Sequence, residues 1–393
     1  MNVVDLVLVV AILIFALTGW RKGFLYGLLS LIGFLAGAAV GLWLAPKLVG
    51  SWKDGLPKAL TALVVVFFLA TMGQVLVGMV GRRLHGAVTW RPAVILNQAA
   101  GAVLSVLSIL LVAWFAADIF VGSSSSSLAR DVRRSQVLGM VDNIIPLDAH
   151  LMTSQIQTMF SDTGFPEVFT GIGPEPVKPV GPPDPAIARR KGVVEAAAQT
   201  VKILGRAPAC GVNLEGSGFP FAPNRVMTNA HVVAGVRSPD VAVGGTGKTY
   251  PAKVVYFDAQ IDVAVLAVPG LPADPLQFSL DAERGDSVAV IGYPEDGPLT
   301  ATPGRVRDVQ YAGGRDIYSH DDVLREIVSM RVEVRPGNSG GPVVDGNGEV
   351  IGVVFASSSE GSDTGYALTA RQVAPAVTAG VSAIDEVSTG GCT

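Results

Sequence analysis

Four long apolar segments occupy most of the first 120 residues of the chain. They run from Val3 to Trp20, Phe24 to Ala45, Leu60 to Val80 and Ala93 to Val121. Each reaches or nearly reaches the roughly 20 residues that span the hydrocarbon core of a bilayer. Because the runs are apolar on all faces, they do not fit the helices of a soluble domain. The sequence therefore predicts a four-helix transmembrane domain over residues 1–121.

The first segment is not expected to be a cleaved signal peptide, because Asp5 stands where a basic region belongs and no small-residue cleavage site follows. Glycines recur at every fourth position of the second segment, and such a stripe lets helices approach closely in lipid. Polar side chains inside the spans are costly in hydrocarbon, so they are expected to face other helices. The glycines are Gly33, Gly37 and Gly41, and the polar residues are Gln74, Asn97, Gln98 and Asp118.

The composition differs between the first and the second part of the chain. A mean hydropathy of +0.46 with 16% charged residues is too apolar for one soluble globule, yet proline and glycine are abundant after residue 164. The net charge of −4 and the absence of a basic run predict no nucleic-acid partner. The two cysteines, Cys210 and Cys392, lack neighbouring histidine or cysteine at metal-ligand spacing, so neither a metal site nor a cofactor is expected.

Residues 122–190 are expected to connect two domains. The pattern predicts helices from Leu128 to Ile145 and from Leu147 to Phe160, separated by Pro146. From Gly171 to Pro185, prolines and glycines are too frequent for a packed core, which predicts an extended spacer. We interpret this spacer as a tether rather than as a dedicated cleavage site, because exposed linkers are cleavable in any protein.

Residues 191–393 predict an all-β domain. Short β-runs are separated by Gly, Pro and Asp turns, which is typical of a barrel architecture. The runs begin with Thr200 to Leu204, Gly218 to Ala222 and Arg225 to Thr228, and continue with Ala252 to Phe257, Val263 to Val268, Ser287 to Ile291, Ile327 to Val334, Val350 to Phe355 and Tyr366 to Thr369.

A glycine-rich turn between two of these runs presents a single hydroxyl. Ser339 stands in Arg335-Pro336-Gly337-Asn338-Ser339-Gly340-Gly341-Pro342. Gly337 leaves the backbone free to direct its own N–H and that of Ser339 to one point, where an oxyanion would lie. A serine hydroxyl needs a general base to become a nucleophile, and the base needs a carboxylate to orient it.

His231 and Asp262 are the candidates for these two roles. His231 follows a strand-like run, whereas the other three histidines lie in a membrane loop, in the connector and in a charged loop. Asp262 opens a buried strand, where its carboxylate is shielded from water. Asp258, four residues earlier, remains the alternative acid.

Together these blocks resemble the trypsin-like serine peptidases, and among them the HtrA/Deg branch. The matching blocks are Gly216 to Phe219, Thr228 to Val233, Asp262 to Leu266, Gly337 to Pro342 and Gly365 to Leu368. The resemblance implies a double β-barrel with His231 and Asp262 from the first barrel and Ser339 from the second. It implies acyl-enzyme catalysis with an oxyanion hole at Gly337 and Ser339.

The same resemblance implies a substrate pocket. Its predicted residues are Glu333, Phe355, Ala356, Ser357, Gly365 and Tyr366. Glu333 lies at a position where some relatives carry a specificity acid, so a preference for basic P1 residues is a hypothesis.

The whole chain resembles a more specific group. The four apolar segments are similar to the colicin V production protein family, and too few residues follow Arg371 for a PDZ domain. This arrangement resembles the actinobacterial acid-resistance periplasmic protease family, MarP. The resemblance implies a multi-pass protein of the bacterial plasma membrane whose protease domain lies on the periplasmic side, acts on proteins of the cell envelope and supports survival in acid.

The cysteines and the loop charges bear on this orientation. A disulfide between Cys210 and Cys392 would close a long loop and contribute up to about 5 kcal/mol, although two unrelated thiols remain the alternative. A disulfide would place the domain in an oxidising compartment. The loops after the first and third apolar segments carry more positive charge than the loop after the second, which favours termini outside the cytoplasm, whereas Arg130, Arg133 and Arg134 after the last segment favour the opposite orientation.

Three functions remain open at this stage. The favoured one is a membrane-anchored serine endopeptidase, with self-cleavage as an option. The second is a catalytically silent module that binds peptides in the barrel cleft. The third is a membrane scaffold or channel with a regulatory protease domain. An acid role would require unmasking or self-cleavage rather than faster chemistry, because His231 must be neutral to act as a base.

Overall fold

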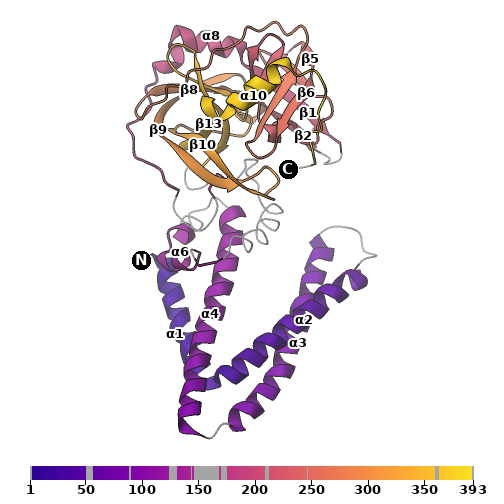
Figure 1. Cartoon of the computed structure of the whole chain (residues 1–393), viewed down its shortest axis with the longest axis vertical. Helices are drawn as coiled ribbons and strands as arrows, with labels where there is room; N and C mark the ends of the chain where they lie inside the picture. The colour runs from indigo at the N-terminus through magenta and orange to yellow at the C-terminus, as the bar shows by residue number, and fades with distance from the viewer. Residues whose placement is uncertain are drawn as a thin grey trace. The chain divides into compact units, whose positions relative to one another are not determined.

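The computed structural model describes residues 2–49, 56–87, 90–123, 131–142, 144–145, 168–169, 175–208, 212–245, 247–358 and 363–391 (Figure 1). The chain divides into two compact units. One comprises Met1–Ala117 with Arg134–Ile145, and the other comprises Asp118–Arg133 with Pro146–Thr393.

The first unit is helical. Its elements are α1 (Val3–Lys22), α2 (Phe24–Val49), α3 (Leu56–Ala87), α4 (Arg91–Ser123) and α6 (Gln136–Asp142). The last residues of α4, from Asp118 on, are assigned to the second unit. Within the described residues, three stretches are long and apolar enough to cross a membrane, namely Val3–Lys22, Phe24–Gly41 and Arg91–Asp118. The remaining predicted span, Leu60 to Val80, lies in α3, and the count of four spans stays a prediction.

Glycines create the close contact between α2 and α3. A methyl group added at Gly33 would lie 2.4 Å from the carbonyl oxygen of Gly73, and one at Gly37 would lie 2.2 Å from that of Leu69. Both distances are too short for any side chain, so the backbones touch directly. The predicted small-residue stripe therefore forms a helix contact at Gly33 and Gly37, as such stripes do in lipid.

The polar residues of the predicted spans behave differently from one another. Asn97 accepts a hydrogen bond of 3.1 Å from the backbone N–H of Leu25, which confirms that it faces another helix. Gln74 is exposed on the surface of this unit, so the expectation that it faces a neighbouring helix is wrong for the single chain. The reason is that α2 meets α3 through Gly73, and the adjacent position on the helix points elsewhere.

Helix α6 is fixed to the helical unit at both ends. Near its start, the buried carboxylate of Asp5 accepts hydrogen bonds from the hydroxyl of Ser135 at 2.7 Å and the N–H of Val137 at 3.2 Å. Near its end, the indole of Trp114 donates to Asp142 at 2.7 Å. Helix α6 lies inside the predicted helix of residues 128 to 145, and the second predicted helix, 147 to 160, lies outside the described residues.

The second unit is built of β-structure, as the sequence predicted. The strands β1 (Val201–Ala207), β2 (Val212–Ala222), β3 (Arg225–Thr228), β4 (Asp240–Val243), β5 (Thr249–Pro251), β6 (Lys253–Asp258) and β7 (Val263–Ala267) form a sheet in the order β5-β4-β1-β2-β3-β7-β6. Its edge strands β5 and β6 are consecutive in the chain, with only Ala252 between them, and among the described residues this half of the domain is a sheet and not the closed barrel that the resemblance implied.

The remaining strands close a barrel. They are β8 (Ser287–Gly292), β9 (Thr300–Arg315), β10 (Asp322–Arg331), β11 (Pro342–Val344), β12 (Val350–Ser357) and β13 (Thr364–Thr369), in the order β10-β13-β12-β11-β8-β9 (Figure 1). Helix α8 (Lys191–Gln199) precedes the sheet. Helix α10 (Ala370–Ser382) contacts β7 and β6 of the sheet as well as β12, β13 and β10 of the barrel, so it joins the two halves.

The predicted spacer is extended but is not a free tether. Residues 175–184 form neither helix nor strand, and a turn begins after them at Pro185. The segment lies against β9 and β10 through hydrogen bonds. Cys210 and Cys392 both lie outside the described residues, so the disulfide stays a prediction.

The glycine contact between α2 and α3 can be tested by adding a side chain. Gly37→Val should lower the stability of the solubilised full chain by roughly 1–3 kcal/mol, because backbones in contact cannot accept extra methyl groups. Leu35→Val, at a side chain that is 58% exposed, is the matched control and should change little. Thermal unfolding in detergent measures both, and equal unfolding temperatures would contradict a direct contact at Gly37.

Candidate active site

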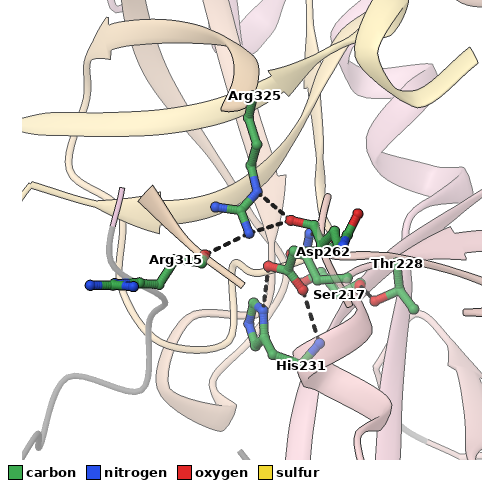
Figure 2. Close-up of polar contacts among 8 residues, drawn as sticks. Ser217, Thr228, His231, Asp262, Arg315 and Arg325 are labelled. Carbon is green, nitrogen blue, oxygen red and sulfur yellow. Dashed lines mark hydrogen bonds and ion pairs between the residues drawn. The ribbon is translucent and has the colours of Figure 1, made fainter. Parts of the chain in front are cut away.

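The pairing of β3 with β7 brings His231 and Asp262 together. Thr228 lies opposite Ala264 in this antiparallel ladder, so the residues just beyond the two strand ends meet. His231 stands in the short helix α9 (Ala230–Val233), and Asp262 directly precedes β7. The imidazole Nδ1 lies 2.7 Å from Asp262 Oδ2, and the backbone N–H of His231 donates to Asp262 Oδ1 at 3.0 Å (Figure 2).

Asp262 is held in a left-handed backbone conformation with φ of +63°. Its side chain is fully buried, and its carbonyl oxygen accepts a hydrogen bond of 2.8 Å from the side chain of Asn229. Aspartate tolerates this conformation better than most residues, but the conformation still costs energy unless neighbouring contacts fix it. The carboxylate is therefore positioned by the fold before any ligand arrives.

A buried arginine from the barrel supports the same loop. Arg325 of β10 is 1% exposed and donates from Nε to the carbonyl oxygen of Gln260 at 2.9 Å and from Nη2 to that of Arg315 at 2.8 Å (Figure 2). Burial lowers the pKa of Arg325, while the negative charge of Asp262, among others, acts in the opposite direction. A positive charge thus lies close to the buried carboxylate.

The alternative acid, Asp258, has other partners. Its carboxylate accepts hydrogen bonds from the N–H groups of Gln260 at 2.9 Å and Ile261 at 3.1 Å, and from the hydroxyl of Tyr256 at 3.3 Å. These contacts shape the loop that leads to Asp262. In the described part of the chain, the carboxylate that contacts the His231 ring is that of Asp262.

The turn that carries Ser339 is fixed to β2 by Ser217. The N–H of Ser217 donates to the carbonyl oxygen of Ser339 at 2.8 Å, and its hydroxyl donates to that of Gly337 at 2.7 Å. The same hydroxyl accepts from the N–H of Tyr293 at 3.0 Å. One small side chain therefore connects the sheet, the serine turn and the strand end at β8.

Gly337 requires glycine for two reasons. Its φ is +91°, and a methyl group there would lie 2.2 Å from the carbonyl oxygen of Tyr293.

Burial raises the pKa of Tyr293 to about 12, so this phenol stays protonated and donates to the carbonyl oxygen of Thr200 at 3.1 Å. Next to it, a hydrogen bond from Lys202 lowers the pKa of Asp296.

Several groups around Ser339 are free to act on a ligand. Ser339 is 4% exposed, and the N–H groups of Gly337 and Ser339 have no backbone acceptor among the described residues. The Nε2 of His231 is buried and has no hydrogen-bond partner in the described part of the chain. At Gly340, an added methyl group would lie 3.1 Å from the backbone nitrogen of Asn229, so the serine turn touches the loop that leads to His231.

The predicted pocket residues lie on neighbouring strands. Ala356 pairs with Tyr366 and Ser357 with Gly365 across β12 and β13, and Phe355, Ala356 and Tyr366 are fully buried. The hydroxyl of Tyr366 donates to Glu175 at 2.5 Å.

Glu333 is engaged elsewhere, because it pairs with Arg335 at 2.8 Å. The pocket and its preference for basic residues stay predictions.

Sequence reasoning assigned no role to Asn229, Ser217 or Arg325. Asn229 and Ser217 lie inside the motifs that carry the resemblance, and membership of these motifs was the one sequence feature that could have indicated a role for them. Arg325 gave no signal, since a single arginine in a strand pattern is normally expected on the exposed face.

The steric requirement at Gly337 yields a direct test. Gly337→Ala should lower the free energy of unfolding by at least roughly 1–2 kcal/mol, because alanine is disfavoured at this φ and its methyl group collides with backbone. Gly313→Ala is the control, since nothing lies within 4 Å of a methyl group at that position. Chemical unfolding of the solubilised chain compares the two, and equal losses would contradict the requirement.

Comparisons with known proteins agree with this geometry. Residues 216–353 match the family model described as trypsin-like peptidase domain, and residues 4–146 match the model described as colicin V production protein. Serine protease Rv3671c of Mycobacterium tuberculosis (strain ATCC 25618 / H37Rv) is 38% identical over 391 residues, which cover 99% of this chain and 98% of the relative. The probable periplasmic serine endoprotease DegP-like of Halomonas elongata is 37% identical over 141 residues, which cover 35% of this chain and 28% of the relative.

A solved structure extends the match. The crystal structure of the Rv3671c protease from M. tuberculosis in its active form superposes with a TM-score of 0.54 at 44% identity, and covers 56% of this chain and 96% of that chain. Because similarity to Rv3671c extends over nearly the full length of both chains, this chain belongs to the MarP family of serine endopeptidases, in which a trypsin-like peptidase domain follows an N-terminal membrane domain.

Proposed function

We propose that Ser339, His231 and Asp262 are the catalytic triad of this endopeptidase. The observation that carries the proposal is the hold of Asp262 on His231. One carboxylate oxygen fixes the backbone of the histidine and the other fixes its Nδ1, so Nε2 is left as the proton acceptor. A histidine in this tautomer and orientation is what a serine nucleophile requires.

The proposed reaction uses groups that the fold already positions. Ser339 Oγ attacks the carbonyl carbon of the scissile peptide bond, and its proton passes to His231 Nε2. The negative oxygen of the tetrahedral intermediate accepts hydrogen bonds from the N–H groups of Gly337 and Ser339. His231 then protonates the leaving amine, and water attacks the acyl-enzyme with His231 again as base. Asp262 stays ionised and stabilises the imidazolium.

Among the described residues, Ser339 and His231 Nε2 do not form a hydrogen bond. Catalytic hydrogen bonds are often long or poorly aligned until substrate binds. We therefore expect substrate binding to align the Ser339 hydroxyl with Nε2. Glu333, Phe355, Ala356, Ser357, Gly365 and Tyr366 remain the proposed pocket.

We further propose that the protein crosses the plasma membrane several times and that its protease domain lies on the periplasmic side. The apolar helices and the loop charges support this orientation. A Cys210–Cys392 disulfide would agree with it, because disulfides persist in oxidising compartments. Mass spectrometry that finds both thiols free in protein isolated from cell envelopes would remove this support.

The proposed substrates are proteins of the cell envelope, and self-cleavage in the connector is a further proposed reaction. A role in acid or envelope stress rests on the family resemblance. Protonation of His231 removes the base, so an acid role would act through unmasking or self-cleavage and not through faster chemistry.

The triad is tested with the solubilised full chain, a fluorophosphonate probe and a peptide substrate. Ser339→Ala should abolish labelling and reduce kcat by about 10⁶, and Asp262→Asn should reduce kcat by about 10⁴, the losses known from other triad enzymes. Asp258→Asn should keep kcat within a few-fold, because Asp258 binds backbone amides of its own loop.

Other outcomes would reassign the function. An equal loss in Asp258→Asn would name that residue as the orienting acid. Absence of labelling in the wild-type chain would favour a silent peptide-binding module. Rescue of a deletion phenotype by residues 1–121 alone would favour a membrane scaffold or channel.

A further inference from the structure

The proline-rich connector is bound to the barrel through its carbonyl groups. Five carbonyl oxygens within residues 176–182 each accept a hydrogen bond from a different side chain of the barrel domain. The bonds are Gln310 to Pro176 at 3.3 Å, Arg307 to Lys178 at 3.1 Å, Arg284 to Pro179, Arg331 to Val180 at 3.3 Å and Arg305 to Pro182 at 2.8 Å. We call Arg284, Arg305, Arg307, Gln310 and Arg331 the strap site, and residues 175–182 the strap.

Beyond Glu175, whose carbonyl oxygen accepts a hydrogen bond of 2.8 Å from the N–H of Val177, burial along the strap repeats as it does in a polyproline II helix. Val177, Val180 and Pro183 are half-buried at every third position, while Pro176, Lys178, Pro179, Gly181 and Pro182 are exposed. Three residues per turn is the repeat of polyproline II, which leaves its backbone carbonyls free of internal hydrogen bonds. Prolines also lack an N–H group, so this peptide offers many acceptors and few donors. Guanidinium groups offer donors only, which makes the strap site chemically complementary to it.

The donors are oriented independently of the strap. Asp363 binds both Arg307, at 3.3 Å, and Arg331, at 3.5 Å. Arg305 also donates to the carbonyl oxygen of Gly285 at 2.9 Å. Arginines that are held by the barrel lose little entropy when a peptide arrives, which favours binding.

The upstream end of the strap is anchored at Tyr366. Glu175 accepts from the Tyr366 hydroxyl, and the ring of Phe169 meets the Tyr366 ring edge to face with centroids 5.6 Å apart. Lys178 adds an ion pair with Asp308 at 2.6 Å. The bound segment therefore has a defined end as well as a defined path.

We propose that the strap site is a binding site for extended, proline-rich peptides, and that the chain fills it with its own connector. Recognition is through backbone carbonyls and the threefold repeat, so it does not depend on one exact sequence. None of the strap-site residues belongs to the proposed triad, and the proposal does not rest on that triad, although the upstream end of the strap contacts Tyr366 of the proposed substrate pocket. Once the covalent strap is removed, a second proline-rich peptide should occupy the same path.

Peptide binding to the full chain tests this proposal. All proteins carry Ser339→Ala to prevent cleavage, and in one of them residues 175–182 are replaced by a Gly-Ser linker of equal length. The probe is a fluorescein-labelled peptide with the sequence of residues 175–182, followed by anisotropy. The linker variant should bind the probe at least about tenfold more tightly than the intact chain, because the tethered strap competes at high effective concentration.

Two controls identify the site. Arg305→Ala, Arg307→Ala and Arg331→Ala together in the linker variant should weaken binding at least about tenfold, since several hydrogen bonds are lost. Alanines at three exposed arginines elsewhere in the domain, Arg189, Arg206 and Arg237, remove the same charge and should leave binding unchanged. A probe with glycine in place of its three prolines should bind more weakly, because it lacks the polyproline II bias.

Binding that is absent from the linker variant, or equally weakened by both arginine triples, would overturn the proposal. If the linker variant does not unfold cooperatively, limited proteolysis of the intact chain decides instead. The strap-site triple should then be cut within residues 176–182 at least about tenfold faster than the control triple. Equal cutting would overturn the proposal.

Discussion

The buried carboxylate of Asp262 is the interaction on which the peptidase domain depends. It accepts from both the backbone and the ring of His231, so its two oxygens are satisfied without water. A buried carboxylate is costly unless it is paired and hydrogen-bonded. The side chain of Asn229 binds the backbone carbonyl of Asp262, and the charge of Arg325 lies close to the carboxylate. The sheet contributes the pair, and the barrel contributes the charge close to it.

Ser217 performs the corresponding task for the serine turn. Ser339 belongs to the loop before β11, whereas His231 lies in α9 after β3 and Asp262 directly precedes β7. The backbone and hydroxyl of Ser217 bind the carbonyls of Ser339 and Gly337, so the turn is registered against β2 and not only against its own barrel. These bonds use the carbonyl oxygens of the turn, and the N–H groups of Gly337 and Ser339 have no backbone acceptor among the described residues.

Much of the candidate site could be predicted because its residues lie at strand ends. The run Arg225 to Thr228 forms β3 as expected, and the start of β7 lies directly after Asp262. Strand β9 was missed, since Pro303 and its glycines are typical of turns. That strand exists because it pairs with both β8 and β10, and this information is not local. Docking of the connector was missed for the same reason, as Arg305 and Pro182 are 123 residues apart.

The position of Arg325 also has a consequence for how the domain opens. Its guanidinium group originates in the barrel but binds the carbonyl oxygen of Gln260, in the loop that follows β6 of the sheet. If the two halves moved apart, the Arg325 guanidinium would lose its acceptor at Gln260 and keep only the carbonyl oxygen of Arg315 among its described acceptors, beside the apolar ring of Phe355. Local opening at the interface therefore carries an electrostatic cost, and sheet and barrel should unfold as a single cooperative unit.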